Sequence, residues 1–552
     1  MRLSAFLTLL VASLFSFKTA PLYAQDKVYD VLIRGALIYD GESTKPFHGD
    51  AGILGEKIAG VGNLKAAKAA KMIDAKGLVL APGFIDAHTH SDFNPLIYPK
   101  LFNKILQGVT SEVIGNCGMS AAPVLGGHHE KIREIWAREG VKIPEVNWKS
   151  FKEYRKALAS EGLTTHFIGL VGHGNLRSAV MGNSPRPASR DEILRMKKML
   201  NQSMSEGAAG VSFGLIYLPG IFAQKEELVE LCREAGKRSG VCAFHMRSEG
   251  SRLIESIEEV ISIGRAAKAP IQISHLKAGG KKNWPKIKEV FRLIEKARRE
   301  GMRITADAYP YTATAAELGV ILPDEIYQRE DRAALFHDPA RRAKLLEELR
   351  EYYQKKNMNW GTVMIASAGG KKYREYEGLT LKEIARETGK EPVMLLVEML
   401  ADTNFEISSF GFSQSEEVVD RVMIQPYVGI GSDSVADGSR KPHPRAFGTF
   451  PKIFNRYYRT QKTLELGETI RKMTSLVADQ FGIEGRGRIR EGYFADLVLF
   501  DAAEMRDLST YENPALLPRG VKWVFVNGTP EVKNGKPTGE KAARFLSPHI
   551  RL

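Results

Sequence analysis

Several side chains that could ligate a metal ion follow predicted β-strands in this sequence. They are His88, His90, Cys117, His245, His275 and Asp433. His88 and His90 are two residues apart, so on extended backbone both imidazoles point to the same side. Imidazole, thiolate and carboxylate are the donors that zinc prefers, and this set exceeds what a structural zinc site needs. The surplus indicates either two metal positions or one metal with an open coordination site.

A parallel barrel would bring these side chains together. Apolar runs rich in strand-forming residues end in polar or glycine-rich turns, and helical patterns such as 191–206 and 284–300 separate most of them. The runs span 83–86, 111–114, 166–171, 210–213, 241–244, 271–274, 303–306 and 427–430. This alternation is typical of an α/β protein with a (β/α)8 TIM-like barrel, whose active site lies at the C-terminal ends of the strands. An open doubly wound sheet is the alternative, but Gly172-His173-Gly174-Asn175 lacks the glycine spacing of a nucleotide-binding turn.

Both ends of the chain contain patterns of short strands. They occur at 31–33, 36–39, 57–61, 496–500 and 521–526, and Asn527-Gly528 is a hairpin turn signal. We therefore predict one small β-sandwich domain from residues 25–80 and 485–552, attached to a barrel of residues 81–484. The stretch between the seventh and eighth barrel strands is too long for one helix. We expect an inserted subdomain around 312–425 that could act as a lid.

The N-terminus has the order of a secretory signal, with Arg2, an apolar stretch and then Leu22-Tyr23-Ala24. We predict a signal peptide over residues 1–24 and an exported, periplasmic protein. The apolar stretch is too short to span a membrane comfortably, so we expect no stable membrane insertion.

Charge and cysteine content exclude other classes of protein. The formal net charge is +14, but basic and acidic residues are interspersed and no nucleic-acid-binding motif is present, so we expect no nucleic-acid partner. Three cysteines exclude a disulfide-stapled fold, and buried thiols are favoured over a Cys232–Cys242 disulfide. The oligomeric state is left open.

The motifs around these residues resemble the amidohydrolase superfamily over nearly the whole mature length. The first and last barrel strands carry Ala-Pro-Gly-Phe-Ile-Asp-Ala-His-Thr-His at 81–90 and Gly-Ile-Gly-Ser-Asp-Ser at 429–434. Within the superfamily the sequence is most similar to the D-aminoacylase family, the N-acyl-D-amino-acid deacylases. The segments that carry this similarity are 115–118, 172–177, 214–220, 245–250, 274–277 and 443–449.

The resemblance implies a metal-dependent hydrolase whose metal is zinc. Cys117, His245 and His275 would hold a tightly bound ion, and His88 and His90 would complete a second position, weaker or empty. Asp433 would be both a ligand and the general base. Residues 212–214 offer no lysine on the fourth strand, so Cys117 would take the bridging place, as in this family. The missing lysine argues against the hydantoinase and dihydroorotase branches.

The substrate implied by the resemblance is an N-acyl-D-amino acid, a small molecule that is hydrolysed to a D-amino acid and a carboxylate. Its α-carboxylate would be bound by Tyr217, Lys277 and Arg445, with Tyr309 as a weaker candidate. The alternatives are another metal-dependent amidohydrolase that acts on a different amide, dipeptide or lactam, and a non-catalytic barrel scaffold.

Three further residues lie in or near these motifs. His173 and His443 either line the pocket or are structural. Glu249 is expected to orient Arg247 rather than to act chemically.

Overall fold

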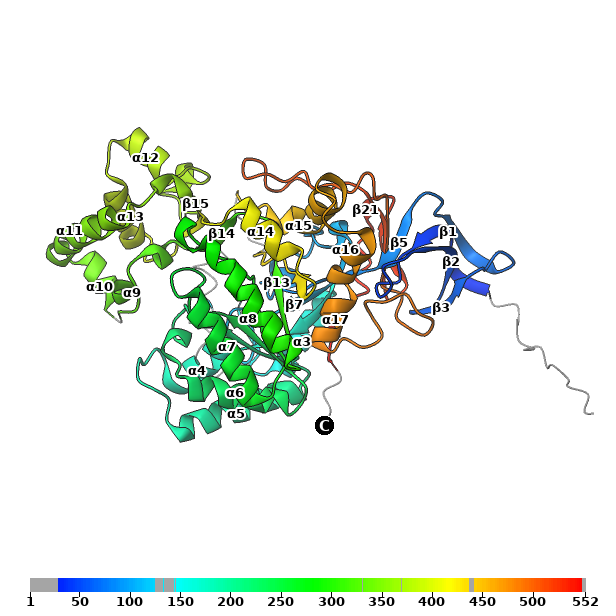
Figure 1. Ribbon diagram of the computed structural model, residues 1–552, viewed down its shortest axis with the longest axis horizontal. Helices are drawn as coiled ribbons and strands as arrows, with labels where there is room; N and C mark the ends of the chain where they lie inside the picture. Colours follow the sequence, from blue (N-terminus) through cyan, green and yellow to red (C-terminus); the bar gives the residue numbers. More distant parts are fainter. Residues whose placement is uncertain are drawn as a thin grey trace, which may run out of the picture.

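The computed structural model describes residues 28–124, 133, 143, 145–329, 331–368, 370–435 and 441–548. The predicted signal peptide lies outside the described residues. A central barrel carries a strand-rich part built from both chain ends at the right of Figure 1, and an inserted subdomain projects at the left.

The barrel strands lie at each of the eight predicted places and run parallel. They are β6 (Phe84–Asp86), β7 (Val109–Ile114), β8 (His166–Gly169) with its continuation β9 (Val171–Gly172), β10 (Gly210–Gly214), β11 (Val241–His245), β12 (Ile271–Ile273), β13 (Ile304–Ala308) and β17 (Val428–Ile430). Ladder pairing runs from β6 to β8 and from β9 to β17. All of these strands are buried. The (β/α)8 architecture is therefore the predicted one.

The first and last strands meet through the turns that follow them. The Ala87 amide donates to the Ile430 carbonyl (3.0 Å) and the Asp433 amide donates to the His88 carbonyl (2.7 Å). The His90 amide donates to the Ser434 carbonyl at 2.9 Å. The barrel thus closes through the residues that were predicted to bind metal.

Amphipathic helices surround the strands. They include α3 (Phe151–Glu161), α4 (His173–Met181), α5 (Arg190–Ser205), α6 (Lys225–Gly236), α7 (Leu253–Ala267), α8 (Ile287–Arg299), α14 (Glu416–Met423), α15 (Arg445–Ile453), α16 (Leu466–Met473) and α17 (Ser475–Phe481). Ser189 starts α5 with a capping box that Glu192 completes. In α8, Ile287, Val290 and Ile294 form a buried stripe at helical spacing. These two helices match the predicted patterns at 191–206 and 284–300.

The two chain ends form one sheet, as the predicted strands at both termini suggested. It is ordered β21 (Lys536–Pro537), β20 (Thr529–Lys533), β19 (Val521–Val526), β18 (Leu497–Phe500), β5 (Val79–Pro82), β1 (Val28–Ile38), β2 (Phe47–Leu54) and β3 (Lys57–Gly62). The long strand β1 pairs with β4 (Lys68–Asp74) along its first half and with β5 along its second. The sheet encloses its own core, which includes Ile33, Leu80 and Phe525.

An inserted subdomain separates β13 from β17, where the sequence predicts an insertion. It contains α9 (Asp324–Tyr327), α10 (Arg332–His337), α11 (Pro339–Lys356), α12 (Leu381–Thr388) and α13 (Pro392–Asp402) beside the sheet β14 (Ala313–Glu317), β16 (Ser408–Phe412) and β15 (Val363–Ser367). A core distinct from that of the barrel, which includes Phe336, Leu396 and Phe405, holds the helices together.

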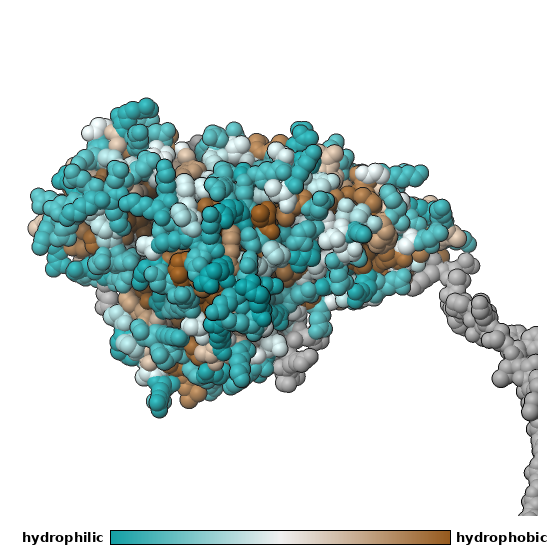
Figure 2. Space-filling model, viewed as in Figure 1, coloured by the Kyte–Doolittle hydropathy of each residue, from teal (hydrophilic) through white to brown (hydrophobic). Residues whose placement is uncertain are grey.

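Cys232 on α6 and Cys242 on β11 are buried free thiols, as favoured from the sequence. Among the residues that the structure describes, no helix combines the length and the apolar character needed to cross a membrane. On the face that Figure 2 shows, hydrophilic side chains predominate and hydrophobic ones form small separate groups.

A buried charge network joins the terminal sheet to the barrel. Arg486 forms an ion pair with Asp496, which immediately precedes β18, and donates to the Asn527 side chain at 2.8 Å. The same guanidinium lies 2.9 Å from His166 Nε2 on barrel strand β8. Because Asp496 is buried, its charge depends on these partners.

We predict that Arg486→Met destabilises the protein by about 3–5 kcal/mol, because the Asp496 carboxylate would be left buried without its partner. Denaturant-induced unfolding of wild type and variant measures the difference. The control is Arg490→Met, which removes an exposed pair with Glu42 and should change stability by less than about 1 kcal/mol. Equal stability of both variants would show that the network does not stabilise the junction.

Candidate metal centre

Unusual backbone geometry aims three of the predicted ligands into the barrel mouth. Cys117, His275 and Asp433 follow β7, β12 and β17 and have φ values of 52°, 35° and 51°. Residues with side chains rarely adopt this left-handed region, and such strain is typical of functional sites. His245 is the last residue of β11, and His88 and His90 follow β6 directly.

The turn that carries Cys117 lies directly on strand β10. The Ser212 hydroxyl donates to the Gly115 carbonyl at 2.5 Å and accepts from the Gly118 amide at 3.0 Å. A Cβ atom at Gly214 would lie 2.0 Å from the Cys117 carbonyl oxygen, so glycine is required there. The fourth barrel strand, β10, therefore supports the Cys117 turn through Ser212 and Gly214.

The structure brings all six predicted ligands together. Cys117 Sγ lies 3.4 Å from both His88 Nε2 and His275 Nε2. His275 Nε2 lies 3.0 Å from His245 Nδ1. Asp433 Oδ1 lies 3.4 Å from His88 Nε2 and 3.3 Å from His90 Nε2.

The electrostatics of this cluster fit a bound cation. Burial raises the pKa of the Cys117 thiol, but the charges of His88 and His275 outweigh it and hold that pKa well below its ordinary value. Burial likewise raises the pKa of the Asp433 carboxyl, which Arg445 and His275 then hold well below its usual range. Candidate ligand atoms of His88, Cys117, His275 and Asp433 lie within 4.8 Å of one another. A thiolate, a carboxylate and imidazoles at this spacing are a donor set that fits zinc.

A cavity of about 260 Å³ opens beside the cluster, and all four predicted substrate-binding residues line it. They are Tyr217, Lys277, Tyr309 and Arg445. Arg445 Nη1 donates to Asp433 Oδ2 at 2.9 Å, and its guanidinium lies 4.8 Å from the centre of the Tyr309 ring. Lys277 Nζ lies 5.8 Å from the centre of the same ring. Two buried cations therefore flank one aromatic ring at the cavity wall.

The other walls of the cavity are largely apolar. Met119, Ile216 and Val435 come from loops of the barrel. Ala315 on β14 and Val320 come from the inserted subdomain. The insertion thus contributes to the binding cavity while the metal cluster belongs entirely to the barrel.

Sequence reasoning missed two carboxylates that orient the ligands. Asp307 on β13 lies 3.2 Å from His88 Nδ1 and accepts from the His275 amide at 2.8 Å. Glu249 lies 2.7 Å from His275 Nδ1 and accepts from Lys277 Nζ at 2.7 Å. A charged residue within the apolar strand 304–308 was the available signal for Asp307. The expectation that Glu249 orients Arg247 is wrong, because Arg247 pairs with Glu259 at 2.9 Å.

His173 and His443 are buried outside the cavity lining. His173 Nε2 lies 2.7 Å from Glu227, which also pairs with Arg177. His443 Nδ1 accepts from the Arg445 amide at 3.0 Å, and its Nε2 donates to the Ala313 carbonyl at 3.2 Å. Burial and the Arg445 cation hold the pKa of His443 well below its ordinary value, so it is neutral. Both histidines are structural, and His443 ties the Arg445 segment to β14.

The chain matches the model described as "Amidohydrolase family" over residues 71–353 and 419–531. It is 34% identical to a D-aminoacylase of Alcaligenes xylosoxydans xylosoxydans over 94% of this chain and 98% of that protein. A structure described for the role of the binuclear metal centre in D-aminoacylase has a TM-score of 0.80 and 33% identity, covering 94% of this chain and 100% of that chain.

A second similar structure carries a ligand. It is N-acyl-D-glutamate deacylase from Bordetella bronchiseptica, complexed with zinc and a phosphonate that mimics the tetrahedral intermediate. Its TM-score is 0.79 at 29% identity, covering 94% of this chain and 100% of that chain.

We predict that Glu249→Gln raises the zinc dissociation constant by about 10- to 100-fold, because a carboxylate behind a metal-binding imidazole makes that imidazole a better donor. Competition with a chromophoric chelator measures this constant without substrate. Glu259→Gln is the matched control, because it removes a carboxylate that pairs with Arg247 and not with a ligand. Unchanged zinc affinity in Glu249→Gln would contradict the assignment.

Proposed function

The chain belongs to the D-aminoacylase family of amidohydrolases, and on that premise we propose that it hydrolyses the amide bond of N-acyl-D-amino acids. The protein is a metal-dependent amide hydrolase, and its metal is zinc. One observation carries the choice of substrate: the buried thiolate, imidazole and carboxylate cluster opens into a cavity that also holds two buried cations. A small amide with a free carboxylate matches both parts of this site.

Zinc, when bound, lowers the pKa of a water ligand to about 7 and so supplies a nucleophile at neutral pH. We propose Asp433 as the general base. Its Oδ1 faces the ligand cluster and its Oδ2 accepts from Arg445, which supports this role. It accepts the proton of the attacking water and passes it to the leaving amine. The water oxygen bonds to the acyl carbon, the C–N bond breaks, and a carboxylate and a free amino acid are released.

The α-carboxylate of the substrate is recognised by Lys277, Arg445 and the Tyr309 hydroxyl. The Tyr309 hydroxyl is buried at the cavity wall, beside the Arg445 guanidinium. Arg445 and Lys277 add positive charge near the Tyr309 ring. Charge-assisted hydrogen bonds from such groups are stronger than neutral ones, so a carboxylate is favoured here over a neutral amide.

We also propose that the protein is exported to the periplasm, and this proposal rests on the N-terminal pattern alone. The order of Arg2, an apolar stretch and the Leu22-Tyr23-Ala24 segment supports cleavage after Ala24 and export to the periplasm.

We predict zinc-dependent hydrolysis of N-acetyl-D-methionine and little or none of N-acetyl-L-methionine, measured as free amine released. Chelation should abolish turnover, and added zinc should restore it, because the metal supplies the nucleophile. Equal turnover of both enantiomers would contradict selectivity for the D-form. No turnover of either by protein shown to hold zinc would mean that the substrate is a different amide.

We predict that Asp433→Asn lowers kcat by about 10²- to 10⁴-fold, because the variant cannot accept the proton of the attacking water. Zinc content, measured in parallel, should be retained through Cys117, His245 and His275. The control Asp479→Asn removes an exposed carboxylate that pairs with Arg488. Near wild-type turnover by zinc-loaded Asp433→Asn would show that another group is the base.

A further inference from the structure

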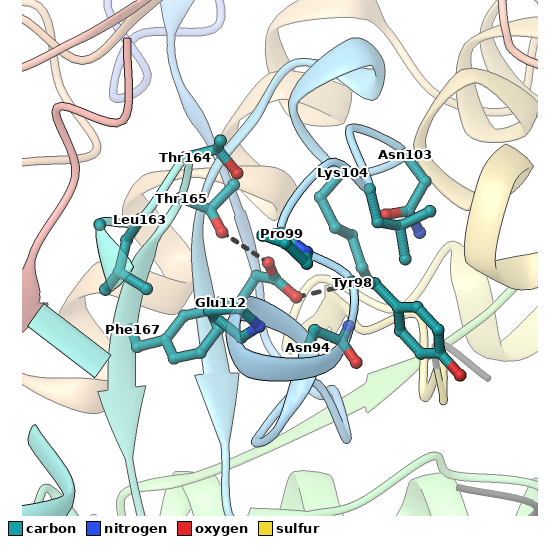
Figure 3. Close-up of a pocket in the computed structure, with 13 residues that line it drawn as sticks. Asn94, Tyr98, Pro99, Asn103, Lys104, Glu112, Leu163, Thr164, Thr165 and Phe167 are labelled. Carbon is teal, nitrogen blue, oxygen red and sulfur yellow. Dashed lines mark hydrogen bonds and ion pairs between the residues drawn. The ribbon is translucent and has the colours of Figure 1, made fainter. Parts of the chain in front are cut away.

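A buried lysine lies behind the metal cluster, outside the cavity that binds substrate. Lys104 is 4% exposed and immediately precedes the short helix η1 (Ile105–Gln107). It lines a separate, water-sized cavity of about 30 Å³ together with Glu112 and Thr165 (Figure 3). Burying an ammonium group is costly unless partners compensate it, so its contacts need explanation.

Lys104 contacts three strands of the barrel at one point. Its Nζ donates to Asp86 on β6 at 2.6 Å and to the Ser432 hydroxyl after β17 at 2.7 Å. Glu112 on β7 lies 3.8 Å from it. Figure 3 shows Glu112 between Lys104 and Thr165, whose hydroxyl donates to it at 2.6 Å. The lysine therefore bridges the strands where the barrel closes.

The partners of Lys104 hold the backbone of the reactive residues. Asp86 Oδ1 accepts from the Ser432 amide at 2.8 Å and from the His88 amide at 3.3 Å. The Ser432 hydroxyl also lies 3.0 Å from that of Ser434. Ser432 and Ser434 flank Asp433, which has a φ of 51°. The direction of the Asp433 side chain therefore depends on the conformation of this turn.

Lys104 is the cation beside two buried carboxylates, and the Ser91 and Thr165 hydroxyls also donate to Glu112. Asp86 is fully buried and Glu112 is 3% exposed, so two carboxylates face one ammonium without solvent. An ion pair that served only to close the barrel would need Asp86 and Lys104 alone. The hydrogen bond to Ser432 adds a direct connection to the turn that carries the base.

We propose that Lys104 is a positioning residue that holds Asp433 in its catalytic orientation through Ser432. The proposal rests on the proposed role of Asp433 as the general base. Lys104 touches neither the cavity nor the carboxylate-binding cations, so its loss affects the chemical step and leaves substrate binding intact. A displacement of about 1 Å at a reacting group can lower a rate by about a hundredfold.

The test compares kcat and KM for Lys104→Met, Ser432→Ala and the double variant. We expect kcat to fall at least tenfold in Lys104→Met, less in Ser432→Ala, with KM within twofold of wild type in both. The double variant should be no slower than Lys104→Met, because both changes interrupt one connection. Lys104→Arg, which keeps the charge and a donor, should recover part of the lost kcat.

Two control substitutions separate this role from general loss of structure. Ser111→Ala removes a buried hydroxyl on β7 that has no hydrogen-bond partner within the described residues. Lys100→Met removes an exposed lysine from the same loop. Both should keep wild-type kcat and KM. If Lys104→Met does not fold, Ser432→Ala alone carries the test, because it leaves the Lys104–Asp86 pair intact.

Three results would overturn the proposal. They are wild-type kcat in folded Lys104→Met or in Ser432→Ala, additive losses in the double variant, and a rise in KM that accounts for the whole effect. Turnover by wild type and Ser111→Ala shows separately that the proposed function holds. If wild type does not hydrolyse N-acetyl-D-methionine, zinc titration tests the positioning instead. Lys104→Met should then weaken zinc at the position formed by His88, His90 and Asp433, and unchanged zinc binding there would refute it.

Discussion

The balance of buried charge at the mouth of the barrel constrains everything else in the structure. A thiolate, several carboxylates and two cations are removed from water within one small volume, and each must be compensated by a neighbour on another strand. Asp433 faces His88 on one side and Arg445 on the other. Arg445 is in turn anchored through its backbone by neutral His443. The strands cannot shift relative to one another without breaking several of these pairs at once.

The barrel and the main ligands could be predicted from the sequence because they depend on local patterns. Apolar runs that end in His88, Cys117 or His275 combine strand periodicity with a chemically distinctive residue. The residues that orient the ligands could not be found in this way. Glu249 and Lys104 contact partners that follow or lie on other strands. The prediction that Glu249 pairs with its neighbour in the sequence, Arg247, is wrong because Arg247 binds Glu259. Such pairings depend on strand register, which a single sequence does not specify.

The sequence lacks a bridging lysine on the fourth barrel strand, β10, and the structure shows which residues lie there instead. Where a bridging lysine is lacking, Ser212 and Gly214 allow the Cys117 turn to approach the strand closely. Small residues there and a cysteine on β7 therefore form one arrangement. Neither the small residues on β10 nor the cysteine after β7 indicates this arrangement alone. Their contact in the structure connects the two.

The inserted subdomain has its own hydrophobic core. The chain enters it from β13 through β14 and returns to the barrel after β16. Residues 354–412 of the subdomain also lie outside the part of the chain that matches the family model. Val320, which lines the cavity, packs against that core, whereas the metal ligands lie on the barrel. A change in the insertion can therefore alter the shape of the cavity wall without moving the residues that hold the metal.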